Sequence, residues 1–149
     1  MPNWITNIVH IEMKLDEEES NYEEQKAKLN KLYKKLKGKN QIFDFDAVIK
    51  SPKNKEVGSC SGKHKDGEVC WYEWNTENWG TKWNAADTKY LMDSYDDDSL
   101  VFEILVKFET AWNTPEPIFK KLAKDFRVRA TWKDEGDDEW HNWEEVAYV

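Results

Sequence analysis

The sequence predicts an α+β fold in which an antiparallel sheet carries two helices on one of its faces. Two observations lead to this prediction. Segments rich in β-branched and aromatic residues are interspersed with segments whose apolar residues recur at helical spacing. Along the 149 residues the order of these segments is strand, helix, strand, strand, helix, strand.

Residues 3–14 predict the first strand, because β-branched side chains dominate there and alternate between two faces. One face is apolar and consists of Ile5, Val9, Ile11 and Met13. Asp16 then caps a helix predicted over residues 17–37, whose acidic first turn suits the positive end of a helix dipole. Its apolar stripe is formed by Leu29, Leu32, Tyr33 and Leu36, and Gly38 is the expected stop.

A loop-rich insertion is predicted at about 38–80, after the first helix. Residues 42–49 suggest a short extended segment. Residues 50–69 are polar and predict a long exposed loop, which we expect to be the most mobile internal segment and the first to be cut in limited proteolysis. Trp71 and Trp74 lie three residues apart, which is consistent with one helical turn.

The second half of the chain supplies the remaining elements. A strand is predicted over residues 81–92, and residues 100–109 give the strongest strand of the chain. Thr114 is the expected N-cap of the second helix, with Pro115 at the first helical position. Residues 127–133 predict a further strand. This succession is the ferredoxin-like α+β plan.

Length and charge narrow the class of protein. A chain of this length can bury one core, so we predict a single domain over residues 1–149. The 30 acidic and 22 basic residues give a net charge of −8, which argues against direct binding to nucleic acid or to an anionic membrane. No apolar run of about 18 residues predicts a membrane span, and no signal-peptide pattern opens the chain. We therefore expect a cytoplasmic location.

The sequence contains five short motifs with aromatic residues. They are Met1-Pro-Asn-Trp4, Phe43-Asp-Phe45, Trp71-Tyr-x-Trp74, Asn78-Trp-Gly-Thr-Lys-Trp83 and Thr110-Ala-Trp112-x-x-Pro115-x-Pro117. In this order they resemble the motifs of the YubB-type ferredoxin-like family, which phages, prophages and plasmids carry. The resemblance implies a ferredoxin-like fold, a mobile-element origin and hence a bacterial host cell. It implies no reaction and no catalytic residue, and the cysteine that often follows Asn-Trp in that family is Ile5 here.

Residues 71–85 form an aromatic block that holds four of the nine tryptophans. Together with a later tryptophan they could line a pocket for a base, with Lys82 meeting a phosphate. The candidate ligand-binding residues are Trp71, Trp74, Trp79, Lys82 and Trp112. We favour the alternative of a core cluster that ties the insertion to the sheet. It predicts that Trp79 and Trp83 are buried, that Gly80 allows a close backbone approach, and that strand alternation puts Lys82 and Trp83 on opposite faces.

Two acidic turns are candidates for partner binding. The first consists of Asp96, Asp97 and Asp98, and the second of Asp134, Glu135, Asp137, Asp138 and Glu139. The second turn has oxygen ligands around a glycine, as calcium loops do, but it lacks the spacing of the twelve-residue loop. We therefore predict two exposed acidic turns that matter for binding rather than for folding.

Cys60, His64 and Cys70 carry side chains that zinc accepts as ligands. Their spacing lacks a paired Cys-x2-Cys knuckle, and a fourth ligand is not evident. We predict no metal and no cofactor, and two reduced thiols as in a cytosolic protein, while a metal bound by these three residues stays open.

No nucleophile motif and no phosphate-binding glycine loop occurs, so nothing in the sequence indicates an enzyme. The sequence favours a non-enzymatic accessory protein that binds a host or phage protein, one version of which inhibits a defence system and a sharper one of which imitates DNA. The alternative is a binder of a nucleotide-like ligand that uses the tryptophan cluster, and a third is a hydrolase whose site only the fold assembles. An open pocket lined by Trp and Lys would favour the ligand binder, whereas a filled aromatic core with one acidic face would favour the protein binder.

Overall fold

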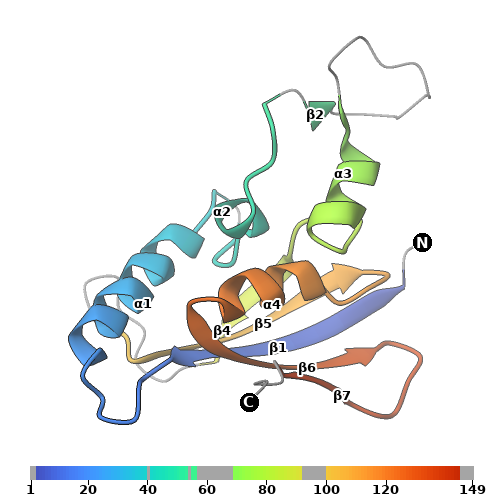
Figure 1. Ribbon diagram of the computed structural model, residues 1–149. Coiled ribbons are helices and arrows are strands. Elements are labelled where there is room, and N and C mark those ends of the chain that lie inside the picture. Colours follow the sequence, from blue (N-terminus) through green and yellow to red (C-terminus); the bar gives the residue numbers. More distant parts are fainter. Residues whose placement is uncertain (1–2, 40, 54, 57–68, 92–99, 145–149) are drawn as a thin grey trace.

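The computed structural model describes residues 3–39, 41–53, 55–56, 69–91 and 100–144. Its elements in chain order are β1 (Trp4–Met13), α1 (Tyr22–Leu36), α2 (Phe45–Val48), β2 (Lys55–Glu56), β3 (Val69–Cys70), α3 (Trp71–Asn78), β4 (Ala86–Tyr90), β5 (Glu103–Ala111), α4 (Glu116–Ala123), β6 (Phe126–Asp134) and β7 (His141–Glu144). Helices α1 and α4 lie on the sheet, and α3 lies farthest from it (Figure 1). No helix in these ranges is long and apolar enough to cross a membrane.

One five-stranded sheet organises the fold, with strand order β4-β5-β1-β6-β7. β1 is central and runs antiparallel to both neighbours, so that Ile5 lies opposite Thr110 of β5 and Asp134 of β6. Helix α1 connects towards β4, and α4 connects β5 to β6. Without the edge strand β7, this order and these connections are the ferredoxin-like arrangement, so the predicted fold class is confirmed.

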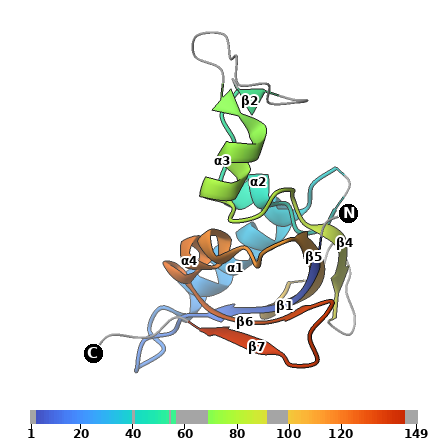
Figure 2. The same cartoon turned by 90° about the vertical axis from the view of Figure 1, so that its right-hand side faces the viewer.

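The two faces of the sheet differ, because side chains alternate along each strand. On β1, one set of side chains is buried at 0–2% exposure, and it consists of Ile5, Asn7, Val9 and Ile11. This set faces α1 and α4, which cover the same side of the sheet (Figure 2). Within the described residues no helix covers the other side. The prediction of two helices on one face is therefore confirmed.

Aromatic side chains fill the space between the sheet and the helices. Phe43 stacks on Phe108 at 5.0 Å between ring centroids, and Phe45 meets Phe108 edge-on at 5.6 Å. All three rings are fully buried. These contacts fix the segment after α1 onto β5, because large rings dominate the burial energy of a core.

Helix α1 begins at Tyr22, later than the predicted residue 17. The Asp16 carboxylate accepts a hydrogen bond from the Ser20 backbone N–H at 2.8 Å, and Glu19 has a left-handed φ of 56°. A left-handed residue cannot continue a right-handed helix. The acidic segment is therefore a turn that precedes the helix, and Asp16 caps that turn.

The prediction of an extended segment over residues 42–49 is wrong, because Phe45–Val48 forms the short helix α2. The Asp44 carboxylate accepts a hydrogen bond from the Asp46 backbone N–H at 3.0 Å, which is an N-cap contact. The spacing of Phe43 and Phe45 suggested a strand, but both rings enter the core from a turn and a helix start.

Trp79 is 4% exposed, as predicted, and its indole N–H donates to the Ile49 carbonyl at 2.9 Å. Gly80 follows with a φ of +80°, and a Cβ there would lie 2.6 Å from Cδ of Pro117. Both the positive φ and the close approach require glycine. The predicted backbone approach at Gly80 is confirmed, and its partner is the start of α4.

The strand predicted over residues 81–92 is shorter, since residues 81–84 form bends and β4 covers only Ala86–Tyr90. The predicted burial of Trp83 is wrong, because its side chain is 38% exposed. Lys82 and Trp83 do not lie on opposite faces either, since the Lys82 ammonium lies 4.6 Å from the Trp83 ring centroid. Strand alternation does not apply where the Thr81 hydroxyl donates to the Trp83 carbonyl in a tight turn.

Strand β7 was not predicted, because residues 134–149 look acidic and then aromatic with no clear alternation. It pairs antiparallel with β6. Its Trp143 packs against Phe119 of α4 at 5.4 Å between ring centroids. This tertiary contact, rather than local sequence preference, accounts for the fifth strand.

The described part of the insertion contains a small two-stranded parallel pairing of β2 with β3. Cys70, at the end of β3, is 4% exposed and disulfide-bonded. The prediction of a reduced thiol at Cys70 is therefore wrong, because pairing depends on how the fold brings sulfur atoms together, whereas the prediction rested on cellular compartment. Residues 57–68, with Cys60 and His64, lie outside the described residues, as does most of the predicted mobile loop.

Candidate functional site

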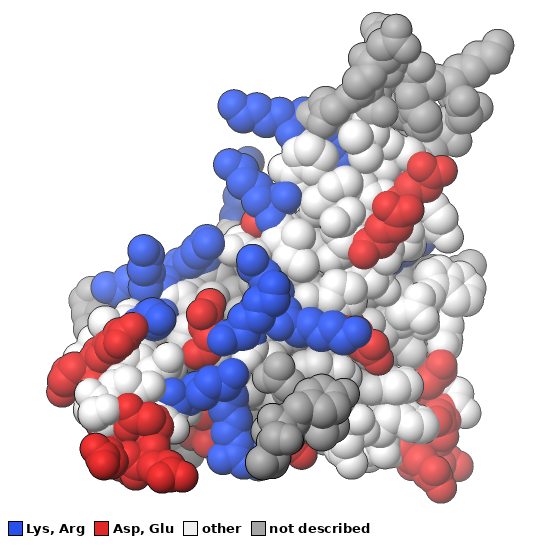
Figure 3. Space-filling view, viewed as in Figure 1, with Lys and Arg blue, Asp and Glu red and all other residues white. Residues whose placement is uncertain are grey.

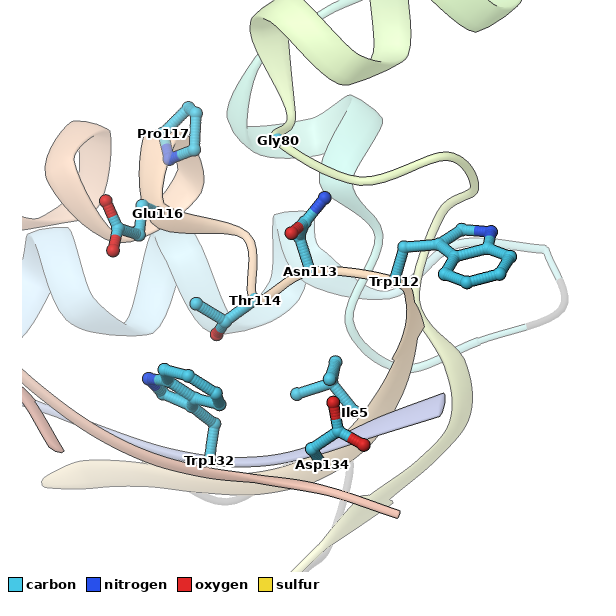
Figure 4. Close-up of a pocket in the computed structure, with 9 residues that line it drawn as sticks. All are labelled: Ile5, Gly80, Trp112, Asn113, Thr114, Glu116, Pro117, Trp132 and Asp134. Carbon is cyan, nitrogen blue, oxygen red and sulfur yellow. The ribbon is translucent and has the colours of Figure 1, made fainter. Parts of the chain in front are cut away.

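A pocket of about 470 Å³ opens at the end of the sheet where β1 begins. Its apolar lining consists of Ile5, Gly80, Trp112, Pro117 and Trp132, and its polar lining of Asn113, Thr114, Glu116 and Asp134. We call these nine residues the sheet-end pocket. Asn113 and Thr114 lie on the loop from β5 to α4, above Ile5, Trp132 and Asp134 on the strands (Figure 4). Its volume is within the range of small-molecule and side-chain binding sites.

A buried network of polar side chains holds the loop in place. The Asn7 amide donates to the Thr110 hydroxyl at 2.9 Å, and the Thr114 hydroxyl donates to the Asn7 amide oxygen at 2.6 Å. The Thr110 hydroxyl donates in turn to the Asn113 carbonyl at 2.6 Å. Asn7 and Thr110 are fully buried, and satisfied buried networks of this kind rigidify what they connect.

Trp112 has a φ of 73°, in the left-handed region that bulky residues rarely adopt. Its backbone N–H donates to the Asn3 carbonyl at 2.7 Å, which fixes this conformation at the end of β5. The indole is 50% exposed. A strained backbone that displays an exposed tryptophan is a feature of functional sites, because the surrounding structure must stabilise it.

The carboxylate of Asp134 is held in one orientation at the opposite side of the pocket. One of its oxygens accepts from the Asn3 amide at 2.5 Å, and the other accepts from the Gly136 backbone N–H at 3.0 Å. A carboxylate oxygen has two lone pairs, so each retains one for a ligand. Glu116 adds a second, exposed carboxylate from the first turn of α4.

Trp132 is supported from behind by the β6–β7 connection. Its ring stacks on His141 at 4.3 Å with an interplanar angle of 24°. His141 lies 2.9 Å from an Asp137 carboxylate oxygen, and this hydrogen bond lowers the pKa of Asp137 below its usual value. The stack fixes the Trp132 indole as a flat surface of the pocket.

Charged side chains form several patches. Acidic side chains lie at the end of the molecule that carries the β6–β7 connection, at the opposite end where β1 leads into α1, and over α3, while lysines lie over α1 and α4 (Figure 3). The exposed lysines of that helix layer include Lys28, Lys31, Lys35, Lys120, Lys121 and Lys124. No Lys or Arg is among the residues that line the sheet-end pocket. The charged side chains of the lining are therefore the two carboxylates of Glu116 and Asp134.

The candidate ligand-binding residues of the aromatic block do not form one site. Trp74 and Trp79 meet edge-on at 5.3 Å, and the Lys55 ammonium lies 4.8 Å and 4.4 Å from their ring centroids. These three side chains pack against one another, so the protein's own groups fill the cluster. Trp71 packs edge-on against the neighbouring Tyr72 at 5.9 Å.

The other two candidates lie elsewhere. Lys82 lies over Trp83, which is 6.0 Å from the Trp4 ring at the start of β1. Of the five candidates, only Trp112 lines the sheet-end pocket. The structure thus separates the five candidates: Trp74 and Trp79 form one cluster, Trp71 packs on Tyr72, Lys82 lies over Trp83, and Trp112 lines the pocket.

Of the candidate acidic residues, Asp134 lines the sheet-end pocket and the other four of that turn follow it in the β6–β7 connection. Glu135, Asp138 and Glu139 are exposed. Asp96, Asp97 and Asp98 lie outside the described residues. Within the ranges that the structure describes, no group of three His, Cys, Asp or Glu side chains is placed to hold a metal ion. The disulfide bond of Cys70 removes the thiolate that zinc would bind.

Sequence reasoning missed Asn113, Thr114, Glu116 and Trp132 as parts of a site. One signal was present, namely Asn7 on the apolar face of a strand, since a buried amide needs partners. The proline-flanked helix start after Thr114 was noticed, but the helix begins at Glu116 with Pro115 as its N-cap. The Thr114 hydroxyl donates to the Asn7 amide oxygen and does not cap the helix.

A pair of carboxyl groups lies apart from the pocket. Burial and a hydrogen bond with Asp87 raise the pKa of Glu109 above its usual value. Asp87 has a left-handed φ of 49° at the irregularity in the β4–β5 pairing. The charge of Asp87 shifts the pKa of Glu109 in the same direction.

The fold defines a ferredoxin-like protein, and one end of its sheet carries a pocket lined by aromatic and acidic side chains. Residues 78–142 match the family model described as the ferredoxin-like domain in Api92-like protein. The matched residues run from the end of α3 into β7 and include every sheet-end pocket residue except Ile5. Comparisons with curated proteins and with solved structures give no significant match.

Proposed function

We propose that this chain is a non-enzymatic accessory protein of a phage or plasmid that binds a host or phage protein through the sheet-end pocket and the acidic turn beside it. In a finer form of this proposal, the bound protein belongs to a defence system and binding inhibits it. The observation that carries the proposal is the strained, half-exposed Trp112 at the mouth of a rigid acidic pocket.

The chemistry of this end suits a protein partner. Exposed tryptophans are enriched among the residues that dominate binding energy at protein interfaces, and Trp83 adds a second exposed indole near the start of β1. The carboxylates of the β6–β7 connection would steer a basic partner and speed its association. The lining holds no His, Cys, Ser or Lys side chain, and its one hydroxyl, that of Thr114, donates to Asn7, which favours binding over catalysis.

The resemblance that suggests a mobile-element origin rests on motifs of which three meet in the structure. Asn3-Trp4, Asn78–Trp83 and Thr110–Pro117 are far apart in sequence, yet Gly80 packs on Pro117 and Asn3 bonds both Trp112 and Asp134. Three of the five motifs on which the resemblance rests therefore lie at or beside the pocket.

The alternative of a nucleotide-like ligand receives less support. A phosphate needs a cation or free backbone N–H groups, whereas the lining of the sheet-end pocket has two carboxylates and no Lys or Arg. Lys82, the residue expected to meet the phosphate, lies over the exposed Trp83 ring outside the pocket.

A comparative capture experiment tests the proposal. The full chain and two variants, Trp112→Gly and Phe102→Gly, are used as baits in a host lysate, and bound proteins are quantified by mass spectrometry. Phe102 is 55% exposed and precedes β5 at the other end of the sheet, so it is the control. A basic protein that the wild type and the control retain, and that Trp112→Gly loses, is expected. A capture profile that all three baits share would contradict the proposal.

A further inference from the structure

The pocket's own chemistry identifies the group that it receives. We infer that the sheet-end pocket binds an arginine side chain, and that this arginine belongs to the partner in the function proposed above, on which the inference rests. The ligand class is a planar guanidinium cation with an aliphatic stem. Nothing in the motifs or in the family match assigns such a site.

The charged side chains that line the pocket favour a cationic ligand. Asp134 and Glu116 contribute two carboxylates, and the lining includes no Lys or Arg. The α4 N-terminus, which elsewhere attracts anions, offers little here, because Pro115 and Pro117 have no N–H and the Glu116 N–H donates to the Thr114 carbonyl at 3.0 Å. A negatively charged ligand would find carboxylates and few donors.

Geometry selects guanidinium over ammonium. The two oxygens of Asp134 are fixed by Asn3 and Gly136 and each keeps a free lone pair, which is what the parallel N–H groups of a guanidinium fork require. Trp132 presents a flat ring whose position is set by its stack on His141. A guanidinium plane stacks on an indole, whereas a lysine ammonium is a compact, strongly hydrated charge.

The pocket is also ready to bind. The network of Asn7, Thr110 and Thr114 and the backbone of Trp112 are set by hydrogen bonds within the fold. A site that is already ordered loses little entropy when it receives its ligand. The apolar side chains of Ile5 and Pro117 provide contacts for the methylene stem.

The test uses small probes on the isotope-labelled full chain. N-acetyl-arginine amide is titrated while the indole signals of Trp112 and Trp132 and the backbone signals of residues 113–116 are followed by NMR. N-acetyl-citrulline amide is the neutral isostere, and N-acetyl-lysine amide is the second cation. We expect saturable shifts with the arginine probe, weaker binding of the lysine probe and no response to the citrulline probe.

Matched variants identify the groups involved. Asp134→Asn removes the charge that the guanidinium would contact and should weaken arginine binding by roughly tenfold, as the loss of a charge-assisted contact does. A thermal melt checks that this variant folds. Glu77→Gln, an exposed change on α3, should leave arginine binding unchanged. Equal responses to arginine and citrulline, or shifts confined to other surfaces, would overturn the inference.

The outcomes separate the inference from the proposed function. If the captured partner depends on Trp112 but the arginine probe does not bind, the arginine inference is wrong and the proposed function stands. If the arginine probe binds but capture is indifferent to the pocket, the proposed function is wrong.

Discussion

The left-handed backbone of Trp112 leads to an unusual expectation for the stabilities of its glycine and alanine variants. Removal of the indole by Trp112→Gly and by Trp112→Ala loses the same packing, but only glycine adopts the φ of 73° without strain. At most exposed positions the order of stability is the reverse, because glycine has more freedom to lose on folding. We expect Trp112→Gly to be more stable than Trp112→Ala.

The magnitude follows from the burial and the backbone. A tryptophan that is half exposed buries roughly 100 Å² of ring, worth about 2.5 kcal/mol at 25 cal/mol/Å², and both variants lose it. Relief of the left-handed strain restores about 1–2 kcal/mol to the glycine variant. The greater freedom of unfolded glycine subtracts about 0.5–1 kcal/mol. Trp112→Gly should therefore exceed Trp112→Ala by about 0.5–1 kcal/mol.

Urea unfolding followed by far-ultraviolet circular dichroism measures this difference without relying on tryptophan emission. Trp140 provides the control, because it has comparable exposure and no left-handed φ. There the alanine variant should equal or exceed the glycine variant. If Trp112→Ala is as stable as Trp112→Gly, the backbone at Trp112 is not strained and the argument for a functional pocket loses its main support.

Three further predictions concern burial, titration and charge. Trp79→Ala should cost about 3–5 kcal/mol and Trp83→Ala only about 1–2 kcal/mol, because the first ring is buried and the second is 38% exposed; equal losses in thermal melts would contradict the packing described. The raised pKa of Glu109 means that the folded state holds this proton more tightly than the unfolded state, so its contribution is present at low pH and is lost as pH rises past the usual value near 4.5. Glu109→Gln, which keeps a hydrogen bond to Asp87, should stabilise the protein by a few tenths of a kcal/mol at pH 7 and not at pH 3, and a gain that is constant with pH would refute this. Neutralising the exposed Glu135, Asp138 and Glu139 should leave the melting temperature nearly unchanged but slow association with the captured partner, as added salt should; an association rate insensitive to both would place the interface elsewhere.

The parts of the fold that depend on local pattern were predictable from the sequence. Alternation along residues 3–14 identified the central strand and its buried face, and the apolar stripe ending at Leu36 identified α1. Trp79 was correctly placed in the core. These features follow from periodicity, which a single segment carries by itself.

The sequence predictions that were wrong or missing concern features that depend on contacts between distant segments. β7 exists because Trp143 packs on Phe119, and no pattern within residues 134–149 shows that contact. Trp79 and Trp83 look alike in sequence, yet only Trp79 faces a site that accepts its N–H. The disulfide of Cys70 likewise depends on where the chain returns.

The pocket depends both on local sequence patterns and on contacts between distant segments. Its tryptophan-bearing segments were noticed, but β1, the turn at Gly80, the β5–α4 loop and β6 meet only in three dimensions. The sequence named Trp112 and Asp134 for two different roles, as a ligand contact and as a partner contact. The structure brings these two residues to one pocket.

Hydrogen–deuterium exchange of the complex with the captured partner tests most directly whether the sheet-end pocket is the binding surface. The account predicts that added protection concentrates at residues 3–8, 79–84, 110–118 and 132–141, which contribute the pocket and its rim. The lysine-rich outer face of α1 should exchange as in the free protein. Protection confined to α1, or to the uncovered face of the sheet, would contradict the account.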